Sequence, residues 1–310
     1  MEIITNNKQI QIPTAITIGS FDGVHKGHID LIEQLKETGE QNNLKTAVIT
    51  FVPHPKIFFK VPDFKLINTL DEKIDLLKKT EIDYLILQEF NLDFANQQPD
   101  DYIRKLIDNY QMKILLMGYD HHFGKDKKGN FVYIKSLEDK MHFETKQIRV
   151  LKERNEPVSS SRIRELIKNG KIQEANELLG YDFFISGKVV SGNRIGNKLG
   201  FPTANIEVDD KNKIKPKQGV YIVSSEIDGN KYYGMMNIGI RPTINGTKEI
   251  SEVHFFNFNQ NIYEKFIKIS FLKRLRKEKK FQSLGDLTTQ LQKDKQISLN
   301  WLNKNQYILK

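Results

Sequence analysis

The segment Ala15-Ile-Thr-Ile-Gly-Ser-Phe-Asp-Gly-Val-His-Lys-Gly-His28 decides the fold of the first half of the chain. Its first four residues form a short apolar run that predicts a buried strand. Glycines then recur every fourth residue, and apolar side chains follow at helical spacing from Ile29 to Leu35. A strand, a glycine-rich turn and a helix predict an α/β unit whose helix N-terminus can bind an anion.

The same alternation continues for about 90 residues beyond this segment. Apolar runs at 47–51, 82–87 and 114–117 predict three more buried strands. Amphipathic segments at 70–79 and 100–109 predict helices, the second with Asp100 contributing to its N-terminal cap. Strands that alternate with helices predict a parallel sheet with helices on both faces. Ligands of such sheets bind at the carboxyl ends of the strands.

The second half has a different pattern. A helix is predicted from about 161 to 179, with Ser159 and Ser160 as candidate caps and Gly180 as its end. Short β-rich runs follow at 188–190, 219–225, 231–238, 252–258 and 266–271, and they predict a small antiparallel barrel. Two helical segments at 284–293 and 297–303 close the chain, with Trp301 on the apolar side. We place the domain boundary near Asp182, which gives domains 1–182 and 183–310.

Composition narrows the class of protein. The 310 residues include no cysteine, which excludes disulfides, thiolate metal sites and thiol nucleophiles. No segment reaches the roughly 18 apolar residues of a membrane span, and the first residues lack the apolar block of a signal peptide. We therefore expect a cytoplasmic protein. The net charge of +9 attracts polyanions, nucleotides among them. One interpretation of the basic run 273–280 is a solvated, charged segment. A nucleic-acid-binding arm is disfavoured, because apolar residues flank the run closely and no aromatic residues are interleaved in it.

Histidines mark the ends of three predicted strands. They lie in the segments Gly19–His28, Phe51–Pro55 and Gly118–Gly124. Carboxyl ends of parallel strands meet at one edge, so these segments are expected to form one site, where imidazole N–H groups can stabilise phosphate charge. The alternative is that His25 and His28 are ordinary histidines, one capping a helix and one half-buried. A zinc site is disfavoured because no tight ligand spacing is present.

A second glycine-rich segment runs from Gly187 to Ile206. Its glycines can bring the backbone close to a phosphate chain. Thr203 and Asn205 offer hard oxygen atoms suited to Mg²⁺. A structural turn between two strands is an equally good interpretation. The segment Ser159–Arg164 is also open to two interpretations, a triphosphate site or a helix cap followed by solvated arginines.

Taken together, and with Met236–Thr243, Glu252–His254 and Leu275–Phe281, these segments resemble the bacterial bifunctional riboflavin kinase/FMN adenylyltransferase family. The resemblance implies a Rossmann-like nucleotidyltransferase domain followed by a β-barrel riboflavin kinase domain. The second would phosphorylate riboflavin with ATP to give FMN, and the first would join FMN to AMP from ATP, giving FAD and pyrophosphate. Mg²⁺ is the implied metal. No nucleic acid or membrane partner is implied, and the protein is expected to be a monomer or a weak homo-oligomer.

The resemblance also assigns residues. Glu252, His25 and His28 take catalytic roles, with Glu252 as the kinase base, and Thr203 and Asn205 bind the metal. The flavin contacts are Pro53, His54, Asp120, Phe123 and Arg276. The nucleotide contacts are Gly19, Phe21, Asp22, Gly23, His25, His28, Ser160, Arg164, Gly187, Lys188, Gly192, Gly196, Gly200, Pro202, Thr203 and Asn205.

Three positions depart from the family pattern: His122, the Ser161-Arg162 pair, and the segment Asn261–Glu264, which replaces an Asp-x-Tyr-Gly turn. Two alternative functions stay open. One is a kinase whose first half binds poorly, which predicts FMN accumulating without FAD. The other is a flavin-sensing or RNA-binding regulator, which predicts salt-sensitive RNA affinity and indifference to Glu252→Ala.

Overall fold

The computed structural model describes the chain apart from residues 6–7, 119–128, 149–150, 154–155, 192–195, 197–198, 244–245 and 308–310, and apart from the side chains of 241–248. Backbone contacts divide it into two compact units, Met1–Ser160 and Ser161–Lys310. We call these the N-terminal unit and the barrel unit. The helices between 160 and 179 are grouped with the barrel unit, and the domain boundary near 182 stays a prediction.

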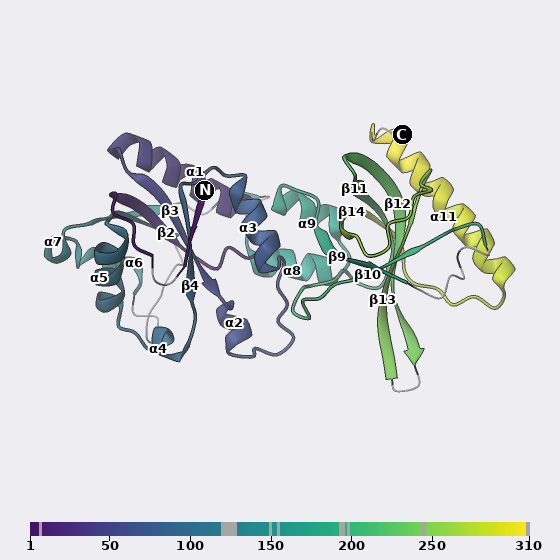
Figure 1. Cartoon of the computed structure of the whole chain (residues 1–310), viewed down its shortest axis with the longest axis horizontal. Helices are drawn as coiled ribbons and strands as arrows, with labels where there is room; N and C mark the ends of the chain where they lie inside the picture. Colours follow the sequence, from purple (N-terminus) through teal and green to yellow (C-terminus); the bar gives the residue numbers. More distant parts are fainter. Residues whose placement is uncertain are drawn as a thin grey trace. The chain divides into compact units, whose positions relative to one another are not determined.

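The N-terminal unit is built on one parallel sheet (Figure 1). Among the described residues its strand order is β1-β4-β3-β2-β5-β6, and every pairing is parallel. The four strands predicted from apolar runs are confirmed. β1 and β6 were not predicted, because β1 is only three residues long and β6 has a single apolar residue, Ile148. The strands are β1 (Glu2–Ile4), β2 (Thr14–Ile18), β3 (Lys45–Val52), β4 (Tyr84–Glu89), β5 (Met112–Gly118) and β6 (Glu144–Ile148).

Helices cover both faces of this sheet, as predicted. Ile16 and Ile18 of β2 pack with α5 (Pro99–Tyr110) in one core. Ala15, on the opposite side of the strand, packs with α1 (Lys26–Asn42) and α3 (Leu70–Lys78) in another. Asp100 does not cap α5: the cap position is Gln98, and Asp100 accepts a 2.5 Å hydrogen bond from the hydroxyl of Tyr133. The helices are α1 (Lys26–Asn42), α2 (Pro55–Phe58), α3 (Leu70–Lys78), α4 (Leu92–Ala95), α5 (Pro99–Tyr110), α6 (Phe131–Lys135) and α7 (Glu138–Met141). A short ribbon of β7 (Lys152–Glu153) and β8 (Glu156–Pro157) follows.

The single helix predicted over 161–179 is wrong. Two helices, α8 (Ser160–Lys168) and α9 (Ile172–Leu179), are separated at Gly170, whose φ is +74°. Glycine adopts this left-handed conformation without the Cβ clash of other residues, so the chain turns there. A Cβ at Gly170 would also lie 2.8 Å from Cδ of Arg274. The predicted end at Gly180 is confirmed, with φ +82°.

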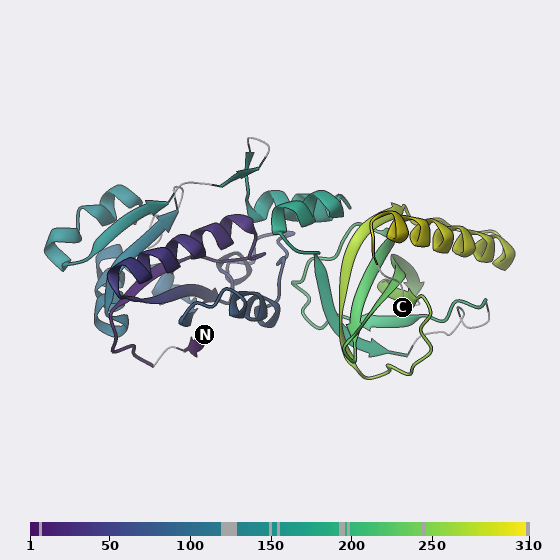
Figure 2. The same ribbon diagram turned by 90° about the horizontal axis from the view of Figure 1, so that it is seen from above.

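The barrel unit contains a closed barrel whose described pairings are all antiparallel. A tight turn joins β11 (Gly219–Ile227) to β12 (Asn230–Thr243), and its residues Asp228 and Gly229 both have positive φ. The two helices predicted at the end form one helix, α11 (Leu284–Lys304), which lies along the barrel (Figure 2) and packs Trp301 against a core cluster. The strands are β9 (Phe184–Val190), β10 (Ala204–Glu207), β11 (Gly219–Ile227), β12 (Asn230–Thr243), β13 (Gly246–Phe255) and β14 (Phe266–Arg276). Across the described residues, none of the helices combines the length and the apolar character needed to traverse a bilayer.

Two candidate active sites

The loop that follows β2 has an unusual backbone. Gly19 still pairs with the sheet, since its N–H donates to the carbonyl of Ile49 at 3.0 Å. Beyond it, Phe21, Gly23 and Val24 have φ of +46°, +94° and +34°. A non-glycine residue in this region costs about 1–3 kcal/mol and persists only when its surroundings impose it. The loop is therefore held in place by contacts from outside it.

One set of these contacts surrounds Asp22. Its buried carboxylate accepts hydrogen bonds from the N–H groups of Ile67 (2.9 Å) and Asn68 (3.2 Å). Its carbonyl oxygen accepts a 2.7 Å bond from the hydroxyl of Ser160. The structure thus brings Ser160 to the predicted phosphate loop. The nucleotide contact predicted for Asp22 stays a prediction, because the observed partners of its carboxylate are backbone groups of the protein.

His25 and His28 lie together where this loop enters α1. His25 is the N-cap, and its Nδ1 accepts a hydrogen bond from the N–H of His28 at 3.3 Å. The two rings stack with centroids 3.7 Å apart. His25 is buried, whereas His28 is partly exposed although its Nδ1 atom is buried. The interpretation of one capping and one half-buried histidine therefore describes their geometry, and the phosphate contact of His28 stays a prediction.

The electrostatic surroundings keep His28 uncharged at neutral pH. Burial is the largest cause that holds the pKa of His28 well below its ordinary value, and the nearby His25 and Lys73 lower it further. A neutral imidazole donates one hydrogen bond through its protonated ring nitrogen. His28 can therefore act on a phosphate as a hydrogen-bond donor.

Sequence reasoning missed Lys73. This residue of α3 is buried, and its ammonium donates to the carbonyl of Ser20 (3.0 Å) and to Oγ1 of Thr50 (2.9 Å). A signal was present, because Leu70, Lys73 and Leu77 follow the spacing of one helical face. A lysine on the apolar face of a helix is expected to be buried, and a buried ammonium group needs hydrogen-bond acceptors.

The end of β3 has an aromatic environment. His54 caps α2, with its Nδ1 accepting from the N–H of Lys56 at 3.1 Å, and its ring lies 4.8 Å from that of Phe64. Pro53 follows a cis peptide bond. Flavin binding by Pro53 and His54 stays a prediction.

Several predicted site residues lie outside the described residues. They are Asp120 and Phe123, with most of Gly118–Gly124 including His122, and Gly192. Arg164 is buried on α8, and its predicted phosphate contact stays a prediction.

The barrel site follows from strand register. Glu252 on β13 lies opposite Asn205 on β10 and opposite Asn237 on β12. Residues directly opposite each other on adjacent strands share a face of the sheet and lie about 5 Å apart at Cβ. The three side chains therefore form a row of oxygen and amide groups across the barrel, one of which is the predicted base.

A cavity of about 290 Å³ lies beside this row. It combines polar groups with an apolar wall, as small-molecule sites do. The predicted base, the predicted metal ligand Thr203 and the predicted flavin contact Arg276 all line it. The polar and charged lining residues are Thr203, Asn237, Glu252, His254, Arg276, Glu278 and Lys279, and the remainder are Gly196, Leu199, Phe201, Val220, Met235, Ile250, Phe281, Leu287 and Leu291.

His254 ties the predicted base to the predicted metal ligand. Its Nδ1 lies 2.8 Å from the carbonyl oxygen of Pro202. A carbonyl only accepts, so Nδ1 is the donor and carries the proton. Burial lowers the pKa of His254, and the bond to Pro202 opposes that effect. The strand that carries Glu252 thus holds the turn that carries Thr203. The sequence contained a signal for this contact, because His254 lies two residues after Glu252 and therefore on the same face of the strand.

Packing against neighbouring backbone accounts for two glycines of this region. A Cβ at Gly187 would lie 2.3 Å from the carbonyl oxygen of Glu207, and one at Gly196 would lie 2.2 Å from that of Phe201. Gly200 has φ +77° and open space around it, as expected of a turn. The structural interpretation is thus supported for Gly187 and Gly196, and their contacts with nucleotide stay predictions.

In the hairpin Asn261–Glu264, the last residue has a left-handed backbone conformation, which glycine adopts most easily. Glu264 has φ +66°, where the family pattern has Gly. Its carboxylate pairs with Lys188 and raises the pKa of that lysine. Lys188 was predicted to contact nucleotide, and its observed partner is this exposed carboxylate.

Arg276 is fixed by a residue that sequence reasoning missed. Its guanidinium donates to the carboxylate of Asp294 on α11 at 2.7 to 3.0 Å, and Gln290 donates to the same carboxylate. Asp294 is buried, so the pair is largely withdrawn from water. The flavin contact of Arg276 stays a prediction.

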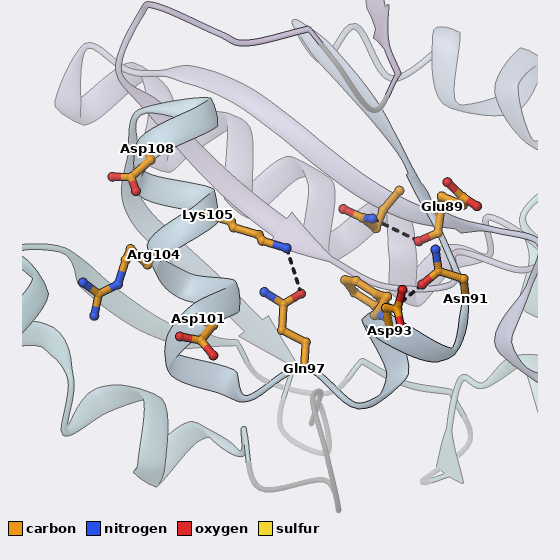
Figure 3. A pocket seen from close by; sticks show the side chains of 10 residues that line it. Glu89, Asn91, Asp93, Gln97, Asp101, Arg104, Lys105 and Asp108 are labelled. Carbon is orange, nitrogen blue, oxygen red and sulfur yellow. Dashed lines mark hydrogen bonds between the residues drawn. The ribbon is translucent and has the colours of Figure 1, made fainter.

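A wider and shallower cavity of about 620 Å³ lies beside α4 and α5 (Figure 3). Carboxylates dominate its lining, with Glu89, Asp93, Asp101 and Asp108 against Arg104 and Lys105. Such a lining repels polyphosphates. None of the residues predicted to bind nucleotide or flavin lines it, so its larger volume does not make it the active site.

Comparisons with known proteins divide the chain into two matched regions. Residues 7–162 match the FAD synthetase family model, and residues 179–302 match the riboflavin kinase family model. The chain is 36% identical over 293 residues to a bifunctional riboflavin kinase/FMN adenylyltransferase of Haemophilus influenzae, covering 93% of this chain and 94% of that protein. It is 36% identical over 304 residues to one of Bacillus subtilis, covering 96% and 95%. A solved structure titled a macrolide-efflux protein from Streptococcus pneumoniae is similar with a TM-score of 0.87 and 32% identity, covering 96% of this chain and 99% of that one.

Proposed function

The chain belongs to the bifunctional riboflavin kinase/FMN adenylyltransferase family, and from this premise we propose how its residues perform the two reactions. The C-terminal domain is a riboflavin kinase and the N-terminal domain is an FAD synthetase. The observation that supports our assignment most strongly is the row Asn205–Glu252–Asn237 beside a cavity. It gives one carboxylate a defined position next to a space for substrate.

In the kinase, Glu252 acts as the general base. The ribityl 5′-hydroxyl of riboflavin attacks the γ-phosphorus of ATP, and the carboxylate takes its proton as the bond to ADP breaks. The apolar wall of the cavity binds the isoalloxazine ring, and Arg276, held by Asp294, borders that space. His254 keeps the Pro202–Thr203 turn in place through its bond to the Pro202 carbonyl.

Thr203 and Asn205 are the residues that would hold Mg²⁺. Their oxygen atoms are the hard ligands that Mg²⁺ prefers, and this ion usually takes few protein ligands together with phosphates and water. Thr203 lines the cavity and Asn205 lies opposite Glu252, so the donor set fits the ion. When bound, Mg²⁺ neutralises charge on the phosphates of ATP.

In the FAD synthetase, no general base is required. An FMN phosphate oxygen is already anionic and attacks the α-phosphorus of ATP, with pyrophosphate leaving. The protein contributes positioning and charge stabilisation. The imidazole of His28 supplies a hydrogen bond to the phosphates, together with backbone N–H groups of the loop at 19–28 other than those of Gly19, Val24 and His28, which donate within the protein. Ser160 strengthens this loop through its bond to the carbonyl of Asp22.

The kinase assignment is tested by Glu252→Gln. We expect FMN formation to fall by about 10²–10⁴-fold, the typical contribution of a general base. Conversion of supplied FMN to FAD should persist. Glu249→Gln is the matched control, because Glu249 lies on the same strand and pairs with the side chain of Lys215. Equal activity of the two variants with riboflavin would contradict the role of Glu252.

The adenylyltransferase assignment is tested by His28→Ala. FAD formation from FMN should fall by about 10²-fold, as when one preorganised donor to a developing charge is lost. FMN formation from riboflavin serves as the internal control and should continue. Undiminished FAD formation would remove His28 and its loop from the mechanism.

A further inference from the structure

The N-terminal unit has a buried cation that the two proposed mechanisms do not use. Lys73 on α3 is only 6% exposed. Removing an ammonium group from water is expensive, so buried lysines are rare unless the surroundings bind them. Burial lowers the pKa of Lys73 to about 8, and the neighbouring carboxylate of Asp22 opposes that effect. The side chain is therefore mostly a cation at neutral pH.

The contacts of Lys73 lie at the start of the proposed phosphate-binding loop, residues 19–28. Its ammonium donates to the carbonyl of Ser20 at 3.0 Å and to Oγ1 of Thr50 at 2.9 Å. The hydroxyl of Thr50 in turn donates to the same Ser20 carbonyl at 3.0 Å. An ammonium from α3, a hydroxyl from β3 and the first loop carbonyl after Gly19 thus form a closed triangle.

The triangle lies where the backbone leaves its ordinary conformation. The next residue, Phe21, has φ +46°, and Gly23 and Val24 are also left-handed. Such a backbone needs external contacts. Fixing the Ser20 carbonyl sets the direction in which the following N–H groups point, and so determines where an anion can bind.

We propose that Lys73 is a positioning residue of the adenylyl-transfer site, whose buried ammonium fixes the Ser20 carbonyl and places a positive charge behind the phosphate-binding loop. This inference depends on the proposed role of the loop at 19–28. A charge in a low-dielectric interior acts more strongly on its neighbours than one in water. Lys73 therefore both shapes the loop and favours the negative phosphates that bind on its outer side.

Three variants separate geometry from charge. Lys73→Met removes both the donor and the cation, while Thr50→Val removes only the hydroxyl of the triangle. Lys78→Met is the matched control, since Lys78 lies on the same helix, has a largely exposed side chain and pairs with Asp75. Each full-length variant is assayed for FMN-to-FAD conversion with ATP, and riboflavin phosphorylation is measured in the same sample.

We expect Lys73→Met to lower kcat for FAD formation by about 10–100-fold, because a small misplacement of phosphate-binding groups has effects of this size. Thr50→Val should lower it by about 2–10-fold, since the ammonium bond to Ser20 remains. Lys78→Met should match the wild type. Riboflavin phosphorylation should be unchanged in all three.

The titration of His28, followed by NMR in the unliganded protein, gives a second readout. The groups that face this imidazole are His25, stacked on it, and Lys73 from α3, with Asp22 next to Lys73. Removing the ammonium should raise the pKa of His28, whereas Thr50→Val should leave it unchanged. A resonance lost in His28→Gln identifies the signal.

The outcomes are distinct. FAD formation by Lys73→Met within about twofold of the wild type would overturn the proposal. So would a loss of activity without a shift of the His28 titration, combined with wild-type kinetics of Thr50→Val, because Lys73 would then be needed only for folding. If His28→Ala keeps full FAD synthesis, the proposed site itself fails, whatever Lys73→Met does.

Discussion

The two candidate phosphate-binding regions, one in each unit, are held in place by different means. In the N-terminal unit, a loop with three left-handed residues is fixed by a few side chains from elsewhere, namely Lys73, Thr50, Ser160 and Asp22 itself. In the barrel unit, Asn205, Glu252 and Asn237 are aligned by the hydrogen-bond ladder of three strands. One site depends on individual buried polar contacts, and the other on backbone pairing.

This difference determines whether a substitution at each site lowers stability, activity or both. A buried polar group whose partner is removed loses its hydrogen bond and is left desolvated, which is costly. A side chain on a strand can change while the ladder beneath it persists, since the ladder uses only backbone groups. Substitutions near the N-terminal site should therefore reduce stability and activity together. Substitutions in the barrel row should mainly affect chemistry.

The largest expected effect is that of Asp22→Ala. Its carboxylate accepts from two backbone N–H groups, and their loss should destabilise the N-terminal unit by about 2–4 kcal/mol. Asn237→Ala in the barrel row should cost less than about 1 kcal/mol. Hydrogen exchange of peptides from the N-terminal unit measures the loss of stability in Asp22→Ala. Fluorescence of Trp301, the single tryptophan of the chain, measures the loss in Asn237→Ala during unfolding.

Asp22→Asn is the control for this comparison. The amide retains one acceptor oxygen, so most of the stability should return. If Asp22→Ala were no more harmful than Asn237→Ala, the contrast between the two sites would be wrong.

The next effect tests whether backbone contacts fix the barrel site. A Cβ at Gly187 would lie 2.3 Å from the carbonyl oxygen of Glu207, so Gly187→Ala should destabilise the barrel unit by about 1–3 kcal/mol. Gly229→Ala is the control, because its φ is +75° but no atom lies within 4 Å of its Cβ position. It should cost about 1 kcal/mol from backbone strain alone. Trp301 fluorescence during thermal unfolding compares them.

Gly187 was also predicted to contact nucleotide, and the same variant tests that role. A higher KM for ATP with unchanged stability would assign the glycine to binding and not to packing. A loss of stability with an unchanged KM would do the reverse.

Much of the architecture could be predicted from the sequence. Apolar runs located β2, β3, β4 and β5, glycine-rich turns located both candidate sites, and the family comparison confirms the two predicted activities. Strand register could not be predicted, because β10 is only four residues long and its partner β13 lies about 40 residues away along the chain. The row formed by Asn205 and Glu252 is visible only in the structure.

Two charged residues were missed for one physical reason. Lys73 follows the helical spacing of Leu70 and Leu77, and Asp294 lies three residues after Leu291 on the packed side of α11. Periodicity assigns such positions to the core, whereas residue type assigns them to the surface. Both are buried and hydrogen-bonded at the edge of a candidate site. A charge on an apolar stripe was therefore a signal of a buried, hydrogen-bonded group, which residue type alone concealed.

The smallest expected effect is a pH dependence that separates the two units. The pKa of His28 lies well below its ordinary value in the folded state, so below about pH 6.5 the unfolded chain binds a proton that the folded N-terminal unit does not. The stability of the N-terminal unit should therefore fall with decreasing pH, by at most about 1.4 kcal/mol per pH unit, until the pH reaches the pKa of His28 in the folded state.

The barrel unit should lose less stability than the N-terminal unit. His254 has a lowered pKa too, but its protonated ring keeps the Nδ1–H bond to the Pro202 carbonyl. Hydrogen exchange at pH 7 and pH 5.5 measures both units, and His28→Gln should reduce the difference in the N-terminal unit alone. An equal pH dependence before and after that substitution would show that other groups are responsible.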